Sequence, residues 1–202
     1  LVPPRVVVAA RKEGIGFAYR PQAVLTDYHM HLQPDGPEAR ERDARRWEAH
    51  GGPRSLGWIG RYVEQAKSRA VGEIAITEHV HRFTVAREWH PNPWWQGEAT
   101  EDLGEHCDAL VAAQEAGLPV LVGIEMDWLP NRRDEIAAVL DAYPFDIVLG
   151  SVHWLDELGI DDPDDPAADH ITAETVWERY LDELIAAAES GLYDVLAHPD
   201  LP

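Results

Sequence analysis

The sequence is poor in cysteine, in basic residues and in long apolar runs, and each shortage excludes a class of protein. Cys107 is the only cysteine among 202 residues, so no internal disulfide can form and a reducing compartment is expected. Lys and Arg total 17 against 37 Asp and Glu, and this net charge of −20 argues against binding of nucleic-acid phosphates or anionic membranes. No apolar run approaches the roughly 20 residues that a membrane-spanning helix requires. The sequence predicts a soluble, acidic, cytoplasmic protein that binds neither nucleic acid nor membrane.

The length favours one domain, which we place at residues 21–202. The first ten residues are apolar, but they lack the basic leader, the long hydrophobic segment and the small-residue cleavage site of a signal peptide. Residues 1–20 match no part of the pattern described below. We therefore expect them to form an N-terminal extension.

Short apolar runs alternate with amphipathic stretches along the chain. They predict strands at residues 23–28, 72–77, 118–125, 145–153 and 193–198, and helices at residues 54–70, 100–116, 134–142 and 172–190. This alternation predicts an α/β fold with a parallel sheet, open or closed into a barrel. The polar stretch 35–52 and the Pro-rich stretch 89–95 are expected to be long loops. The acidic stretch 156–169 lacks the spacing of an EF-hand, so a solvated, mobile loop is favoured over a calcium site.

The ten histidines are the most informative feature, because several of them follow predicted strands. The strand ends carry these ligand-type residues: His29, His31, Glu78, His79, Glu125, Asp127, His153, His198 and Asp200. Each alone is more often an incidental loop or core residue than a ligand. Since the carboxyl ends of parallel strands converge on one face, the whole set predicts a polynuclear metal centre.

Imidazole and carboxylate together suit zinc, manganese or iron(II) better than calcium or magnesium. His29 and His31 are two residues apart, so an extended backbone places both rings on the same side. Glu125 leaves a strand where a carboxylate could bridge two cations. Two such ions about 3.5–4 Å apart can clamp the oxygens of a phosphate ester around an attacking hydroxide.

Five short segments at these positions resemble a known family. The segments are Asp27–His31 (DYHMH), Ile76–His79 (ITEH), Gly123–Asp127 (GIEMD), Gly150–Leu155 (GSVHWL) and Leu196–Leu201 (LAHPDL). Together they resemble the PHP superfamily of metallophosphoesterases, and within it they are most similar to the monofunctional histidinol-phosphate phosphatases. The resemblance extends from about Val24 to Pro202.

The resemblance implies a distorted (βα)7 TIM-like barrel with a centre of two or three divalent metal ions (zinc, manganese or iron). It implies the metal ligands His29, His31, Asp35, His79, Glu125, His153 and His198. Glu125 would bridge the first two ions, and His79 with Asp35 would serve a third. The family also closes its site with a late Asp-x-His motif that is not found before Pro202. We therefore expect the barrel in this chain to lack its C-terminal portion.

The reaction implied is hydrolysis of a small phosphate monoester, with L-histidinol phosphate in histidine biosynthesis as the first choice. Glu125 would be the catalytic carboxylate, and His81 and Asp200 are the candidate proton donors; orientation of ligands is their alternative role. Arg82 is the nearest cation to a ligand strand and could hold phosphate, or it could cap a carboxylate. Trp154 could contact the substrate, although core packing would explain it equally well.

Two other functions remain open from the sequence. The same metal site could act on a nucleotide or on the 3′ end of a nucleic acid, although the net charge of −20 opposes this. The missing closing motif also allows a non-catalytic, metal-binding domain. The oligomeric state cannot be predicted.

Overall fold

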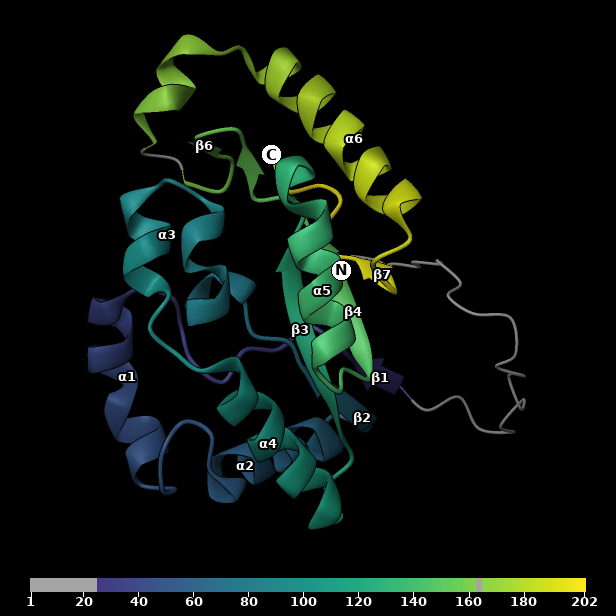
Figure 1. Cartoon of the computed structure of the whole chain (residues 1–202). Helices are drawn as coiled ribbons and strands as arrows, with labels where there is room; N and C mark the ends of the chain where they lie inside the picture. Colours follow the sequence, from purple (N-terminus) through teal and green to yellow (C-terminus); the bar gives the residue numbers. More distant parts are fainter. Residues whose placement is uncertain (1–24, 163–164) are drawn as a thin grey trace.

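A parallel sheet forms the centre of the molecule. The computed structural model describes residues 25–162 and 165–202, so the expected extension at residues 1–20 lies outside the described residues (Figure 1). The sheet contains β1 (Leu25–Asp27), β2 (Val71–Ile76), β3 (Val120–Asp127), β4 (Ile147–Ser151) and β7 (Val195–Leu196). Their spatial order follows the chain, β1-β2-β3-β4-β7, and every pairing is parallel. An order without reversal is that of a barrel wall, not of a doubly wound sheet.

The helices between the strands pack against one face of this sheet. Four of these helices are α2 (Leu56–Ser68), α4 (Leu103–Glu115), α5 (Arg133–Ala142) and α6 (Ala173–Ser190). Their buried residues, such as Ile59, Leu110, Ile136 and Tyr180, join the side chains of the strands in one large apolar cluster. The expected α/β fold with a parallel sheet is therefore confirmed, and the sheet curls as half of a barrel would (Figure 1).

Alternation along β3 decides which side chains reach the site. The helix-facing residues of this strand are Val120, Val122, Ile124 and Met126. The opposite, inner face has a smaller apolar cluster that includes Ala75, Ile147 and Leu149, with Leu121 packed against it. Glu125 and Asp127 share the parity of Leu121, so they lie on the inner face at the carboxyl end of the strand.

The predicted helix from Thr172 is confirmed together with both of its ends. The Thr172 hydroxyl accepts a hydrogen bond from the Thr175 backbone N–H at 3.2 Å. Gly191 ends α6 in the left-handed conformation, with φ of 68°. The other predicted helices and strands are present with ends shifted by a few residues.

Two stretches expected to be loops are helical instead. Residues 37–48 form α1 (Pro37–Glu48), and the Pro-rich stretch contains the end of η2 (Thr84–Trp89) and the start of α3 (Pro93–Glu98). Trp47 is the buried residue of α1, so this helix has almost no apolar period for a pattern to detect. For α3 the sequence does contain a helix-start signal: Asn92 caps the helix and Pro93 occupies its first position.

The acidic stretch is also more ordered than expected where it is described. It contains most of a small antiparallel hairpin, β5 (Trp154–Leu155) with β6 (Leu158–Gly159), and a 3-10 helix, η4 (Pro166–His170). Asp165 joins the two, because its carboxylate accepts hydrogen bonds from the backbone N–H groups of Gly159 at 2.9 Å and Ala167 at 2.8 Å. Residues 163 and 164 lie outside the described residues.

The remaining short helices are η1 (Val80–Arg82), which follows β2, and η3 (Pro130–Arg132), which precedes α5. None of the helices in the described part of the chain has both the length and the hydropathy of a membrane span. Because the helices cover one face of the sheet, the carboxyl ends of its strands remain available for a site.

We predict that Gly150→Ala lowers the free energy of unfolding by about 1–3 kcal/mol, because overpacking a tight core is destabilising. An added Cβ would lie 2.4 Å from Cγ of the buried Tyr193 ring. Urea unfolding followed by circular dichroism measures the change. Gly60→Ala in α2 is the matched control: its Cβ would meet open space, so a gain of about 0.5–1 kcal/mol is expected. Equal effects of the two substitutions would contradict this packing argument.

Candidate metal centre and adjoining cavity

The carboxylate of Glu125 lies at the middle of a ring of imidazoles at the carboxyl ends of the strands. Glu125 is fully buried. Its Oε2 is 2.7 Å from Nε2 of His29, 3.2 Å from Nδ1 of His79 and 3.4 Å from Nε2 of His31. These three histidines come from the ends of two different strands, so the convergence predicted from the sequence is present on this side.

The other carboxylate oxygen has its own pair of imidazoles. Oε1 of Glu125 is 2.9 Å from Nε2 of His198 and 3.5 Å from Nε2 of His153. Nδ1 of His153 lies 2.8 Å from Oδ1 of Asp127, which directs the opposite edge of the ring toward Glu125. Tyr180 donates a hydrogen bond to the backbone carbonyl of His198 at 2.8 Å, and His198 adopts a positive φ of 26°. Glu125 thus contacts imidazoles through both of its oxygens.

The segment with the first two histidines is fastened to the end of β2. Thr77 exchanges two hydrogen bonds with Met30: its backbone N–H donates to the Met30 carbonyl at 2.8 Å, and its hydroxyl accepts from the Met30 N–H at 3.2 Å. The Glu78 carboxylate accepts a hydrogen bond from the backbone N–H of Leu32 at 2.6 Å. Because these bonds fix residues 29–32, the two imidazoles keep their place over the sheet.

Asp35 extends the cluster beyond Glu125. Its Oδ2 is 3.3 Å from Nε2 of His79, and its Oδ1 is 3.4 Å from Nε2 of His81. The two rings stack with centroids 4.8 Å apart. Burial raises the pKa of Asp35, but the hydrogen bond from His81 and the charge of Arg82 outweigh it and hold this pKa far below its usual range. Asp35 is therefore an ionised carboxylate beside two imidazoles.

Arg82 is completely buried beneath this cluster rather than open to a ligand. Its Nη2 donates to Oδ1 of Asp35 and to the Gln33 carbonyl, both at 2.7 Å, and its Nε lies 3.3 Å from Oε2 of Glu78. Burial raises the pKa of Glu78, but its polar contact with His31 and the Arg82 charge lower this pKa to about 2. This placement favours the carboxylate-capping role of Arg82 over contact with a phosphate.

Buried polar atoms without hydrogen-bond partners show that the cluster suits cations. They include Nδ1 of His31, Nδ1 of His79 and Oδ2 of Asp127. Burial lowers the pKa of His79 to about 3, which leaves a neutral ring with a lone pair to offer. Two groups have their ligand atoms within 4.8 Å of one another and share Glu125: His29, His31 and Glu125, and His79, Glu125 and His153. This donor set fits borderline divalent ions such as zinc.

A third group has similar spacing but is not equally free to bind a cation. It contains Asp35, His81 and Glu98. Both oxygens of Glu98 already accept hydrogen bonds from Arg40, at 2.6 and 3.1 Å, and one of them also accepts from the Gly36 N–H at 3.0 Å. Asp35 and His81 are therefore the members of this group that face the main cluster.

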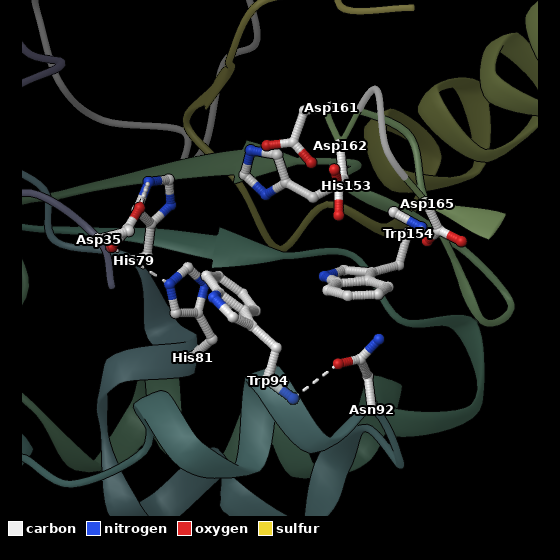
Figure 2. A pocket seen from close by; sticks show the side chains of 11 residues that line it. Asp35, His79, His81, Asn92, Trp94, His153, Trp154, Asp161, Asp162 and Asp165 are labelled. Atoms are coloured by element: carbon white, nitrogen blue, oxygen red, sulfur yellow. Dashed lines mark hydrogen bonds and ion pairs between the residues drawn. The ribbon is translucent and has the colours of Figure 1, made fainter. Parts of the chain in front are cut away.

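An open cavity of about 320 Å³ adjoins the cluster (Figure 2). Its lining consists of Asp35, His79, His81, Asn92, Trp94, His153, Trp154, Gly159, Asp161, Asp162 and Asp165. Figure 2 shows the indoles of Trp94 and Trp154 side by side within it. Asp200, a candidate proton donor in the sequence, is exposed and is not part of this lining.

Sequence reasoning missed three parts of this site. Glu78 and Asp127 stand at strand ends, but nothing in the sequence pattern indicates that they contact and orient His31 and His153. Trp94 was placed in a loop, and its position beside the histidines follows from α3, which was not expected. Asp127 and Glu125 are two residues apart on β3, so their side chains share one face of the sheet. This spacing could have predicted that Asp127 lies at the site.

Comparisons with known proteins agree with this geometry. A family model described as the PHP domain matches residues 53–202. A protein of Deinococcus radiodurans named probable histidinol-phosphatase is 29% identical over 182 residues, which cover 88% of this chain and 61% of that protein. A solved structure of histidinol phosphate phosphatase from Lactococcus lactis, complexed with zinc, L-histidinol and phosphate, is similar with a TM-score of 0.53 and 21% identity. That match covers 80% of this chain and 52% of the solved one, so the chain spans about half to three fifths of these relatives.

We predict that Arg82→Met lowers the free energy of unfolding by about 3–5 kcal/mol, because it leaves buried carboxylates without a counter-charge. Glu78 is 1% exposed, so water cannot replace the guanidinium. Thermal or urea unfolding of the chelator-treated protein measures the change. Arg61→Met is the matched control: its partner Glu64 is on the surface of α2, and a loss below about 1 kcal/mol is expected. A loss for Arg82→Met as small as that of the control would contradict the buried network.

Proposed function

The chain belongs to the PHP domain family, and on that premise we propose that it is a metal-dependent phosphatase of small phosphate monoesters. L-histidinol phosphate is the proposed substrate, hydrolysed to L-histidinol and phosphate in histidine biosynthesis. Two relatives with histidinol-phosphatase in their names support this choice. We also propose that the curled sheet corresponds to part of a distorted (βα)7 barrel, with residues 21–202 as one domain.

The observation that carries the proposal is the convergence of five imidazoles on the buried Glu125. We propose His29, His31 and Glu125 for one ion and Glu125, His153 and His198 for a second. His79 and Asp35 would serve a third ion. Bound zinc, manganese or iron(II) would supply positive charge to the phosphoryl oxygens and lower the pKa of water.

The chain's own residues hold this arrangement in place. Asp127 accepts a hydrogen bond from Nδ1–H of His153, which directs Nε2 toward Glu125, where it could bind a cation. The Glu78 and Arg82 pair lies directly below His31 and Asp35 and limits their movement. The carboxylate of Glu125 supplies negative charge between ions that would otherwise repel one another.

The leaving alkoxide needs a proton, and His81 is better placed than Asp200 to donate it. His81 is nearly buried, lines the cavity and lies 3.4 Å from Asp35, which can stabilise the protonated ring. Asp200 is exposed outside the cavity lining. Trp154 belongs to the cavity wall, so we propose it as a substrate contact, whereas Arg82 has a structural role.

The test is the metal content and turnover of the protein beside its Glu125→Gln variant. We predict that the wild type binds divalent metal and hydrolyses L-histidinol phosphate. The variant should bind less metal and hydrolyse the ester at least about 100-fold more slowly, because a neutral amide cannot compensate the positive charge of two cations. Elemental analysis and phosphate release measure the two effects, with Glu135→Gln on the surface of α5 as control.

Other outcomes would identify other functions. Metal without turnover of any phosphate ester would indicate a non-catalytic metal-binding domain, a candidate kept open because the chain spans 52–61% of its relatives. Faster hydrolysis of a nucleoside phosphate than of L-histidinol phosphate would indicate a nucleotide substrate. Unchanged metal content and activity in Glu125→Gln would remove the bridging carboxylate from the proposal.

We predict that His81→Asn slows hydrolysis of an alkyl ester such as L-histidinol phosphate about 100-fold, the usual contribution of a general acid. Hydrolysis of p-nitrophenyl phosphate should fall far less, because p-nitrophenolate leaves without a proton. Steady-state rates on the two esters measure the difference. Asp200→Asn is the control and should slow neither ester selectively. An equal loss on both esters in His81→Asn would assign His81 a positioning role instead.

A further inference from the structure

The cavity beside the cluster is where the organic part of a phosphate ester must lie. Its lining contains Asp35, His79 and His153, which also belong to the candidate metal centre. A phosphate held at that centre therefore leaves the rest of the ester to the far side of the same cavity. The residues on that side determine which alcohol fits.

Negative charge dominates the part of the cavity that the acidic stretch lines. Asp161, Asp162 and Asp165 line it, and no lysine or arginine does so among the residues that the structure describes. Asp165 already accepts hydrogen bonds from Gly159 and Ala167, so it serves mainly to hold the rim. The Asp161 carboxylate is exposed and, like His153, lines the cavity.

Two indoles form another wall of the same cavity (Figure 2). Trp94 is 44% exposed, which is unusual for an indole, and its ring centroid is 6.4 Å from that of Trp154. His90 packs on Trp154 with centroids 4.2 Å apart, and Nε2 of His90 lies 2.8 Å from the Asp156 carbonyl oxygen. The β5–β6 hairpin is thereby held against the segment between η2 and α3.

We propose that this cavity selects esters whose alcohol is an organic cation, with Trp94, Trp154 and Asp161 as the residues that recognise the positive charge. An ammonium group gains from the faces of indoles and from a nearby carboxylate. A second phosphate would instead meet three carboxylates, so nucleoside diphosphates and nucleic acids are disfavoured. The inference rests on the proposed phosphatase function and identifies the positive charge of the alcohol as the feature that the site recognises.

The test compares two esters that differ only in the charge. L-histidinol phosphate has an α-ammonium group, and 3-(imidazol-4-yl)propyl phosphate lacks it. In the wild type kcat/KM should favour the ammonium ester, and Asp161→Asn should reduce that preference about twofold to fivefold, the contribution of one exposed charge contact. The preference should also weaken with added salt in the wild type and less so in the variant.

The aromatic wall is tested in the same way. Trp94→Leu should reduce the preference about tenfold, whereas Trp94→Phe, which keeps an aromatic face, should reduce it less. Glu157→Gln is the matched control, because Glu157 is an exposed acid of the same hairpin that does not line this cavity. An unchanged preference in both Asp161→Asn and Trp94→Leu would overturn the inference, as would an equal reduction in Glu157→Gln.

A binding measurement separates this inference from the proposed function. L-histidinol and 3-(imidazol-4-yl)propanol are titrated against the protein with tryptophan fluorescence as the signal. If the wild type hydrolyses neither ester but binds L-histidinol more tightly, and Asp161→Asn loses that difference, the function fails and the inference stands. If it hydrolyses both esters equally and binds both alcohols equally, the function stands and the inference fails.

Discussion

A fully buried carboxylate needs compensating positive charge or hydrogen-bond donors, and the site is arranged around this need of Glu125. Burial raises the pKa of Glu125, yet its electrostatic interactions with His79 and His153 and its hydrogen bonds with His198 and His29 hold this pKa well below its usual range. A carboxylate in such surroundings stays ionised at neutral pH. Buried atoms beside it, such as Nδ1 of His198 and Oδ2 of Asp127, have no hydrogen-bond partner among the described residues and are free to bind divalent cations.

The order of the strands in the sheet is enough to bring these groups together. All five strands of the described sheet are parallel and follow one another in space as in sequence. Their carboxyl ends therefore lie along one rim, and each strand delivers its last side chains there. β3 supplies Glu125 and Asp127 on its inner face, and the segments after β1, β2, β4 and β7 supply the histidines.

The parts of the site that depend on strand periodicity were predictable, and those that depend on packing were not. His29, His31, His79, His153 and His198 follow apolar runs, so their meeting around Glu125 could be foreseen and is present in the structure. The burial of Arg82 could not, because a charged residue in a short 3-10 helix has no pattern that distinguishes a surface cation from a buried one. α1 could not be predicted either, because its polar sequence buries little beyond Trp47 and so has no apolar pattern.

The two halves of the site differ in how they are built, and this difference has a functional reason. Beneath the imidazoles, Glu78 and Arg82 are almost inaccessible to water, and such a pair is costly to bury unless it fixes geometry. Metal ligands need that fixed geometry, because bond lengths near 2 Å tolerate little displacement. Around the cavity, Asp161 and Trp94 are exposed and can adapt to different organic groups. In the proposed phosphatase, a metal centre held by buried groups beside an exposed cavity rim would let one metal chemistry be kept while substrate choice varies. Substrate specificity would then depend on α3 and the β5–η4 segment rather than on the histidines.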